Sequence, residues 1–188
     1  MGWLLGESAK KIGCSERTLR RYINVGLLRG RRVAGGQLEL SCAEETYLRG
    51  HWTLLSKLMD ALRTERDVRL AVLFGSTATG EDTPVSDLDL LIVHRRPEWR
   101  VQAGLRLRLR RAAGTPVDVV TLGQAEAQPS LLADVLREGR VLIDRDDLWG
   151  ALQQRRNEIL AAGAREDELI MTRARATLAA ARERLAQA

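Results

Sequence analysis

The hydrophobic and polar pattern near the N-terminus predicts two short helices followed by a hairpin. One or two helical turns at Ser8–Ile12 end at Gly13, a residue that readily adopts the left-handed conformation of a helix C-terminus. Ser15 then caps a second helix, in which apolar residues recur at spacings of three and four, and Gly26 ends it. Glycines and an apolar–polar alternation follow across residues 29–40 and predict a short β-hairpin.

Further along the chain, the pattern changes from that of a helix to that of buried strands. A helix with one apolar face is predicted from about Ala43 to Arg66. Short apolar runs bounded by turn residues then predict strands at Leu70–Phe74, Leu88–Val93, Pro116–Leu122 and Val141–Ile143. Helices are predicted at Glu98–Ala113, at Leu131–Arg137 and from Asp146 to the end, with a break at Gly163. The Leu-Arg alternation at 105–110 would also suit an edge strand. The expected fold class is α+β, with a small mixed sheet flanked by helices and a helical C-terminus.

Composition sets limits on this fold. With 188 residues, 45% hydrophobic and 29% charged, the chain has the composition of a globular protein and the length of one domain or two small ones. No apolar run approaches the roughly 20 residues that cross a bilayer, and the N-terminus does not follow the pattern of a secretion signal. We therefore expect a cytoplasmic protein with no membrane partner. Cys14 and Cys42 are too few for a disulfide framework or a zinc cluster.

Basic residues are distributed unevenly. The net charge is +5, and residues 1–32 alone hold eight basic and two acidic residues. A second run, residues 95–111, holds seven arginines, and it fits a helix with a basic exposed side better than a track for nucleic acid or triphosphate. The N-terminal excess coincides with the two short helices, which makes nucleic acid the first candidate partner of that segment.

A glycine-serine pair and three acids form the candidate chemical site. Asp87 and Asp89 lie two positions apart, so their carboxylates point the same way in a strand and repel each other unless cations lie between them. Such oxygen ligands suit Mg²⁺ that also holds substrate phosphates. Gly75 permits a close backbone approach, and Ser76 offers its hydroxyl and amide to a phosphate. Asp118 would join the pair if its strand lies beside theirs. The alternative is a plain turn beside acids on a solvated strand face.

These residues resemble the polymerase β-like nucleotidyltransferase superfamily, and in particular its minimal nucleotidyltransferases. The matching pattern is Phe74-Gly75-Ser76, then Asp87-Leu88-Asp89 after a spacer, then Asp118, within about Val68–Asp144. The resemblance implies that the three acids hold two Mg²⁺ ions and that the third helps to activate the acceptor hydroxyl. It also implies that the glycine-serine pair binds the triphosphate of ATP. Many relatives carry an arginine shortly after that pair, where this chain has Thr77-Ala78-Thr79.

Three N-terminal motifs carry a second resemblance: Gly6–Gly13, Thr18-Leu19-Arg20-Arg21-Tyr22 and Gly26-Leu27-Leu28. Over about Leu4–Leu48 the chain is similar to the winged helix-turn-helix of the MerR family of regulators. In that family the second helix enters the DNA major groove and the wing touches the backbone. The implied DNA contacts are Arg17, Thr18, Arg20, Arg21 and Tyr22, with Arg31 and Arg32 on the wing. In place of the family's usual wing motif the chain has Gln37-Leu38-Glu39. The alternative is a helical module whose arginines are solvated or bind a protein.

Four segments follow from these patterns. Residues 1–48 are predicted to be a DNA-binding winged helix-turn-helix, 49–66 a connecting helix, 67–145 a nucleotidyltransferase domain and 146–188 C-terminal helices. The resemblances imply a Mg²⁺-dependent enzyme that transfers AMP from ATP to a protein hydroxyl, as antitoxins of HEPN-type toxins do, and that binds its own operator DNA. Three alternatives stay open: a regulator whose core only senses nucleotide, a core without turnover, and an adenylyltransferase of a small molecule such as an aminoglycoside. Apolar stripes on the C-terminal helices favour a homodimer.

Overall fold

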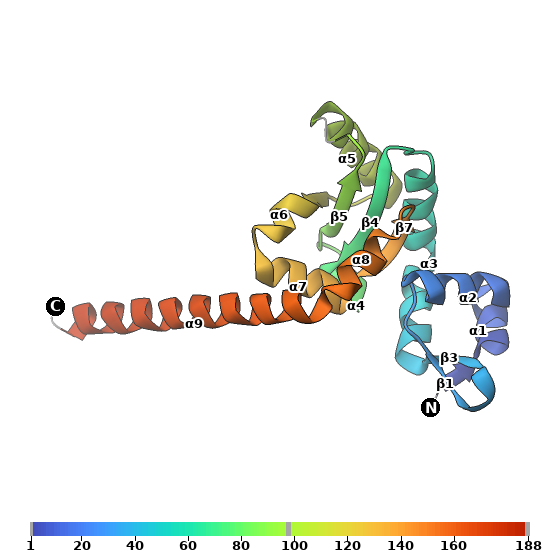
Figure 1. The fold of residues 1–188 in the computed structure, drawn as a ribbon, viewed down its shortest axis with the longest axis horizontal. Coiled ribbons are helices and arrows are strands. Elements are labelled where there is room, and N and C mark those ends of the chain that lie inside the picture. The colour runs from blue at the N-terminus through green and yellow to red at the C-terminus, as the bar shows by residue number, and fades with distance from the viewer. Residues whose placement is uncertain (1, 97–98, 187–188) are drawn as a thin grey trace.

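A small three-stranded sheet and two short helices form the N-terminal unit, residues 2–48 (Figure 1). The structure is a computed structural model that describes residues 2–96 and 99–186. Helices α1 (Leu5–Ile12) and α2 (Glu16–Val25) end at left-handed Gly13 and Gly26, as predicted, and the Ser15 side chain caps α2 by accepting a hydrogen bond from the Thr18 amide. The predicted hairpin consists of β2 (Gly30–Arg32) and β3 (Leu38–Ser41), joined through a 3-10 turn, η1 (Ala34–Gly36). Strand β1 (Gly2–Leu4), which the sequence pattern does not predict, pairs with β3.

A single helix, α3 (Cys42–Arg63), leads from the N-terminal unit to the larger sheet. Its first turn is capped by Ser41, whose hydroxyl accepts a hydrogen bond from the Glu44 amide at 3.1 Å. The predicted connecting helix is therefore continuous with the end of the N-terminal unit. The same helix contributes Tyr47 and Leu48 at one end and Leu58 and Leu62 at the other to one buried face.

The larger sheet is mixed, as expected from the sequence. Its strands are β4 (Val68–Phe74), β5 (Leu88–His94), β6 (Val117–Thr121) and β7 (Arg140–Asp144), in the order β6-β5-β4-β7. Strands β5 and β6 are parallel, whereas β4 is antiparallel to both β5 and β7. Because β5 and β6 run in the same direction, the acids near their N-terminal ends lie at the same end of the two strands.

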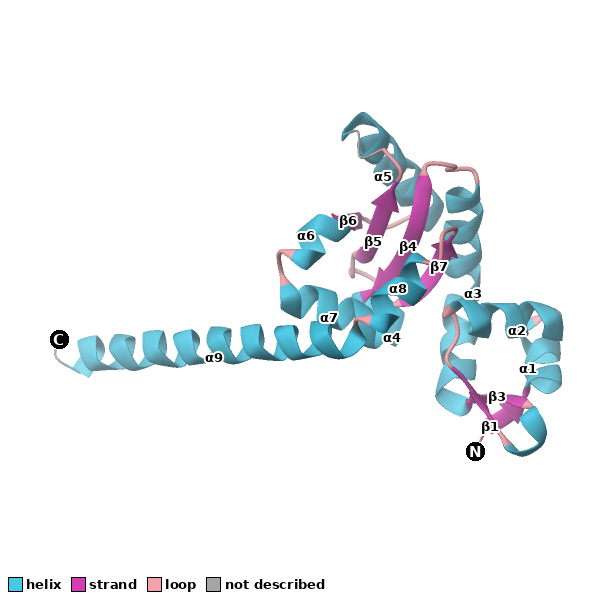
Figure 2. Cartoon of the chain, in the orientation of Figure 1, coloured by secondary structure: helices cyan, strands magenta, loops and turns pink. Residues whose placement is uncertain are grey.

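Helices cover both faces of this sheet (Figure 2). One face packs against α3 and α5 (Trp99–Ala113), and the Leu-Arg alternation therefore belongs to a helix and not to an edge strand. Four helices lie on the other side: α6 (Leu122–Glu126), α7 (Pro129–Glu138), α8 (Leu148–Gln154) and α9 (Arg156–Ala186). The short helix α4 (Gly75–Thr79) directly follows β4 and contacts α7.

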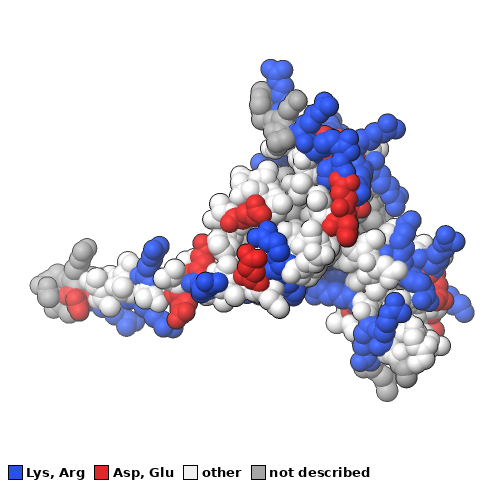
Figure 3. All heavy atoms as spheres, viewed as in Figure 1, with Lys and Arg blue, Asp and Glu red and all other residues white. Residues whose placement is uncertain are grey.

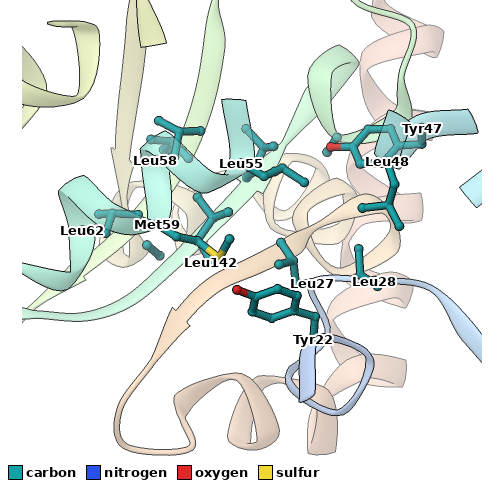
Figure 4. Packing of buried hydrophobic residues seen from close by; sticks show 14 of the residues in the cluster. Tyr22, Leu27, Leu28, Tyr47, Leu48, Leu55, Leu58, Met59, Leu62 and Leu142 are labelled. Atoms are coloured by element: carbon teal, nitrogen blue, oxygen red, sulfur yellow. The ribbon is translucent and has the colours of Figure 1, made fainter. Parts of the chain in front are cut away.

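One hydrophobic core extends from the N-terminal unit into the sheet. The cluster contains Leu19 and Leu27 of the N-terminal unit together with Leu55 of α3 and Leu73 of β4, all fully buried. Figure 4 shows Tyr22, Leu27 and Leu28 close to the α3 side chains and to Leu142 of β7. A backbone hydrogen bond from Val141 to the carbonyl of Gly26 adds a polar contact at 3.1 Å. The N-terminal unit is therefore packed against the sheet and is not a separate body on a linker.

The predicted helix break at Gly163 is wrong. Helix α9 is continuous from Arg156 to Ala186, and the interruption lies at Arg155, between α8 and α9. Gly163 is buried where α9 crosses α7, and a Cβ atom there would stand 2.5 Å from the Cβ of Ala133 and 3.0 Å from the Pro129 carbonyl oxygen. The glycine therefore permits a close helix crossing instead of ending a helix.

The distal half of α9 extends away from the body (Figure 1). Glu166 attaches α9 to the start of α7, because its carboxylate accepts hydrogen bonds from the amide and the hydroxyl of Ser130 at 2.7 and 2.8 Å. Every side chain from Asp167 to Glu183 is exposed, including Leu169, Ile170, Met171 and Leu178 at 52–62%. Across residues 2–96 and 99–186, none of the helices has both the length and the apolar character of a membrane span.

Candidate active site

The end of strand β4 forms the first wall of the site. Gly75 has a φ of +71°, which favours glycine, and it begins α4 directly after Phe74. A Cβ atom at this position would stand 2.5 Å from Oδ2 of Asp89. Both the backbone conformation and the space therefore require a residue without a side chain. Ser76 follows, half-buried, and its carbonyl accepts the amides of Gly80 and Glu81 at 2.9 Å, which closes the turn after α4.

The three predicted acids lie at the edge of the sheet that faces Gly75. Asp87 is exposed just before β5, and Asp89, half-buried within β5, pairs in register with Asp118 of β6. The expected neighbour relation of the two strands is thus confirmed. Burial raises the pKa of Asp89, and the charges of Asp118 and Asp87 raise it further. The carboxylates of Asp87 and Asp118 are therefore close enough to repel that of Asp89.

Asp118 is held by an arginine that the sequence analysis did not assign to the site. Arg106 of α5 donates from Nη2 to Oδ1 of Asp118 at 2.6 Å and from Nε to the carbonyl of Val117 at 2.7 Å. In this arrangement no three acidic, histidine or cysteine side chains of residues 2–96 and 99–186 form a group that could hold a metal ion. The donor set nonetheless fits Mg²⁺, because it consists of carboxylate oxygens whose mutual repulsion a cation would relieve. Arg106 binds Oδ1 of Asp118 and would compete with a metal ion for this carboxylate.

A second residue that was not among the predicted site residues, Arg140, holds α4 in place. Arg140 is 1% exposed and donates from Nε to the carbonyl of Ala78 in α4 at 2.7 Å. It also forms a bidentate ion pair with Glu44, in the first turn of α3. The signal in the sequence is an arginine at the start of an apolar strand run, Val141–Ile143, where a buried charge needs a partner. That partner lies 96 residues away along the chain.

Most of the predicted DNA contacts lie on the exposed face of α2. Arg17, Arg20 and Arg21 are exposed, and Thr18 is half-buried, with its hydroxyl bonded to Ser15 at 2.8 Å. Figure 3 shows Lys and Arg gathered over the N-terminal unit and over α5. The Arg20 side chain pairs with Glu16 at 2.9 Å.

The prediction for Tyr22 is wrong. Its side chain is in the core, 8% exposed, with its ring 5.9 Å from that of Trp52. Tyr22 lies three residues after Leu19 on the buried face of α2, so it cannot reach a DNA groove without leaving the core. On the hairpin, Arg31 is paired with Glu39 at 2.7 Å, whereas Arg32 is exposed.

Comparison with known proteins identifies the class of the larger unit. Residues 56–148 match the family described as polymerase beta, nucleotidyltransferase. The matched part, about half of the chain, is thus similar to nucleotidyltransferases of the polymerase β type, and it contains Gly75, Ser76 and all three acids. No curated protein matches the chain.

Several solved structures are similar to the chain at low identity. One is a crystal structure of a toxin-antitoxin with AMP-PNP: 21% identity, TM-score 0.45, covering 66% of this chain and 94% of that chain. A mutant of the toxin-antitoxin MntA-HpeT has 19% identity and a TM-score of 0.45, with 66% and 94% covered. The third is a tri-AMPylated Shewanella oneidensis HEPN toxin in complex with MNT antitoxin: 19% identity, TM-score 0.42, with 68% and 95% covered.

Proposed function

We propose that the nucleotidyltransferase domain transfers AMP from ATP to a hydroxyl group of a protein and that it requires Mg²⁺. The observation that carries the proposal is the placement of Asp87, Asp89 and Asp118 together at one end of neighbouring strands, with Asp89 directly against Gly75. The three carboxylates would hold two Mg²⁺ ions, which, when bound, stabilise charge on the attacking and leaving oxygens of an in-line displacement at the α-phosphate.

The chain's own residues orient the reactants. The absence of a side chain at Gly75 lets the triphosphate approach the backbone at the start of α4, where Ser76 offers its hydroxyl. Asp118 lies on the edge strand β6 and is 62% exposed, so it can accept a proton from an acceptor hydroxyl that arrives from solvent. Arg106, once released from Asp118, is a cation at the mouth of the site.

A macromolecular acceptor fits the openness of the site. Asp87 and Asp118 are both exposed, so a side chain on the surface of a second protein can reach them. The resemblance to minimal nucleotidyltransferases makes a HEPN-type toxin the partner that we propose, with the chain acting as its antitoxin in the cytoplasm. A small-molecule acceptor such as an aminoglycoside is the alternative acceptor class.

For the N-terminal unit we propose a winged helix-turn-helix that binds operator DNA. Three arginines project from one exposed helix face, and the two helices are joined by three residues, as in helix-turn-helix proteins. Arg17, Thr18, Arg20 and Arg21 remain the proposed contacts, with Arg32 on the wing. The second candidate function, a regulator whose core only senses nucleotide, is favoured by the direct contact between Arg140 of the domain and Glu44 of the N-terminal unit.

The test is incubation of the full chain with Mg²⁺ and α-labelled ATP in lysate of its host. The expected result is a labelled protein that is missing when Asp87→Ala/Asp89→Ala is used, while the variant keeps its circular dichroism spectrum. A labelled small molecule would replace the protein acceptor with a small one. Intact ATP binding with no labelled species at all would contradict transfer and leave the nucleotide-sensing regulator.

A further inference from the structure

Arg140 is a buried cation that connects the nucleotide loop, defined here as residues 75–82, to the N-terminal unit. Its Nε donates to the carbonyl of Ala78 at 2.7 Å, inside α4. Its Nη1 and Nη2 bind the two carboxylate oxygens of Glu44 at 2.6 and 3.0 Å. Nη1 also donates to the carbonyl of Leu27 at 3.2 Å, directly after the end of α2. One guanidinium therefore joins α4, the start of α3 and the turn that follows α2.

Helix α3 contacts the nucleotide loop at a second place. The Tyr47 ring lies against the Arg140 guanidinium, 3.5 Å from ring centroid to Cζ, and stacks on His51 at 4.3 Å. His51 is hydrogen-bonded through Nε2 to Asp82 at 2.7 Å. A Cβ atom on Gly80 would already lie 3.2 Å from the Tyr47 ring. The residues that follow α4 are therefore packed directly on α3.

From these contacts we infer that Arg140 and His51 are positioning residues for the nucleotide loop, through which the N-terminal unit sets the affinity of the loop for ATP. The inference rests on the proposed nucleotide site at Gly75 and Ser76. A helix of five residues is too short to be stable by itself, so α4 takes its position from its neighbours. The N-terminal unit supplies Tyr47, which packs beside Gly80 at the end of α4, and Glu44, which holds Arg140.

The coupling works in both directions. A ligand that shifts the end of α2 acts on the Leu27 carbonyl and, through Arg140, on Ala78. By linkage, ATP in the loop then changes the affinity of α2 for its own ligand by the same factor. The guanidinium of Arg140 is planar, so it cannot keep its hydrogen bonds to all three residues if one of them moves. A shift at one end of this connection therefore breaks a bond at the other. We expect a factor of about five, at the lower end of typical coupling between sites.

Hydrogen exchange on the full chain tests the inference without using activity. The probe is the non-cleavable α,β-methylene analogue of ATP with Mg²⁺. The analogue should slow amide exchange in residues 75–82 and also in residues 26–29, which lie outside the proposed nucleotide site. Exchange in residues 8–12 of α1, which do not contact Arg140, provides the internal reference.

Two variants remove the connection by separate routes. Arg140→Lys keeps the buried charge but cannot make all the hydrogen bonds of the guanidinium to Ala78, Leu27 and Glu44. His51→Phe keeps the stacking on Tyr47 but loses the bond to Asp82. Each should bind the analogue about fivefold more weakly and lose the slowed exchange at 26–29. The matched control is Arg137→Lys, which alters an exposed ion pair with Asp134 on α7 and should behave as the wild type. His51→Phe keeps the inference testable if Arg140→Lys fails to fold.

Each outcome is decisive for one claim. Slowed exchange at 75–82 together with 26–29, lost in His51→Phe, supports the coupling. Slowed exchange at 75–82 alone, or analogue affinity unchanged in both variants, overturns the coupling and leaves the proposed function intact. No effect of the analogue at 75–82 in the wild type overturns the nucleotide site and with it this inference.

Discussion

Gly75 and Asp89 face each other so closely that the glycine has no room for a methyl group. The carboxylate oxygen of Asp89 would lie 2.5 Å from an added Cβ, and the two residues sit on neighbouring strand ends because Phe74 pairs with Asp89. Gly75, which we propose lets the phosphates approach the backbone, thus also determines where Asp89, a proposed metal ligand, lies.

The first prediction is that Gly75→Ala slows transfer by about 100-fold while the chain stays folded. The added methyl displaces Asp89, and a misplacement of about 1 Å at a reacting centre costs about 100-fold in rate. The measurement is AMP transfer together with the thermal midpoint. Gly114→Ala is the matched control, because Gly114 also has a positive φ, +77°, but nothing within 4 Å of the added atom. Equal activities of the two alanine variants would contradict the role of Gly75.

The second prediction concerns the contact between Arg106 and Asp118. Arg106→Ala should strengthen binding of Mn²⁺ to the nucleotide-free chain by roughly two- to fivefold, because Arg106, held in an exposed ion pair, no longer competes with the metal for Asp118. Titration calorimetry measures this affinity. Arg108→Ala, on the same helix but paired with Glu65, should leave it unchanged. Weaker Mn²⁺ binding in Arg106→Ala would show that the arginine organises the acids instead of competing for them.

The third prediction is an acid sensitivity caused by His94. Burial lowers the pKa of His94 below its ordinary value of 6.5, an effect that Asp67 only partly offsets. The unfolded chain therefore binds the proton more tightly than the folded one, so this residue makes stability decline as the pH falls below about 6.5. His94→Leu should reduce the fall of the thermal midpoint between pH 7 and pH 5 by a few degrees. An equal fall in both proteins would show that other groups cause it.

The fourth prediction concerns the exposed part of α9. Met171 and Leu178 lie seven residues apart on one helix face and are 53% and 62% exposed, which fits the proposed homodimer. Met171→Glu/Leu178→Glu should shift the chain to a monomer in sedimentation equilibrium. Ala176→Glu, on the opposite face of the helix, should not. A wild-type chain that sediments as a monomer at all concentrations would contradict the homodimer.

Local chemistry made much of this fold predictable. Ser15, Gly13 and Gly26 mark helix ends through interactions within a few residues, and short apolar runs mark the strands wherever both sheet faces are covered. The acids of the site could be found because a spacing of two residues in a strand fixes a shared direction, although the register that joins Asp118 to Asp89 had to be assumed.

The features that the sequence did not reveal depend on distant partners. Tyr22 was assigned to DNA because it ends the Thr18–Tyr22 motif of the second resemblance, but its packing against Trp52 decides its position. Gly163 was interpreted as a helix end because the pattern within one helix cannot show that α7 crosses there. The pairing of Arg140 with Glu44 joins residues far apart in the chain, and no local pattern predicts such a pair.

The buried pair of Arg140 and Glu44 also determines how the chain can be divided. A fragment without the N-terminal unit would lose Glu44, the counter-charge of Arg140, together with Leu27 and Tyr47, which contact the same guanidinium. The apolar side of α3 and β7 that packs against the N-terminal unit would become exposed at the same time. The two units should therefore unfold in one cooperative transition, and exchange of either unit between related proteins would succeed only if the arginine and the glutamate were exchanged together.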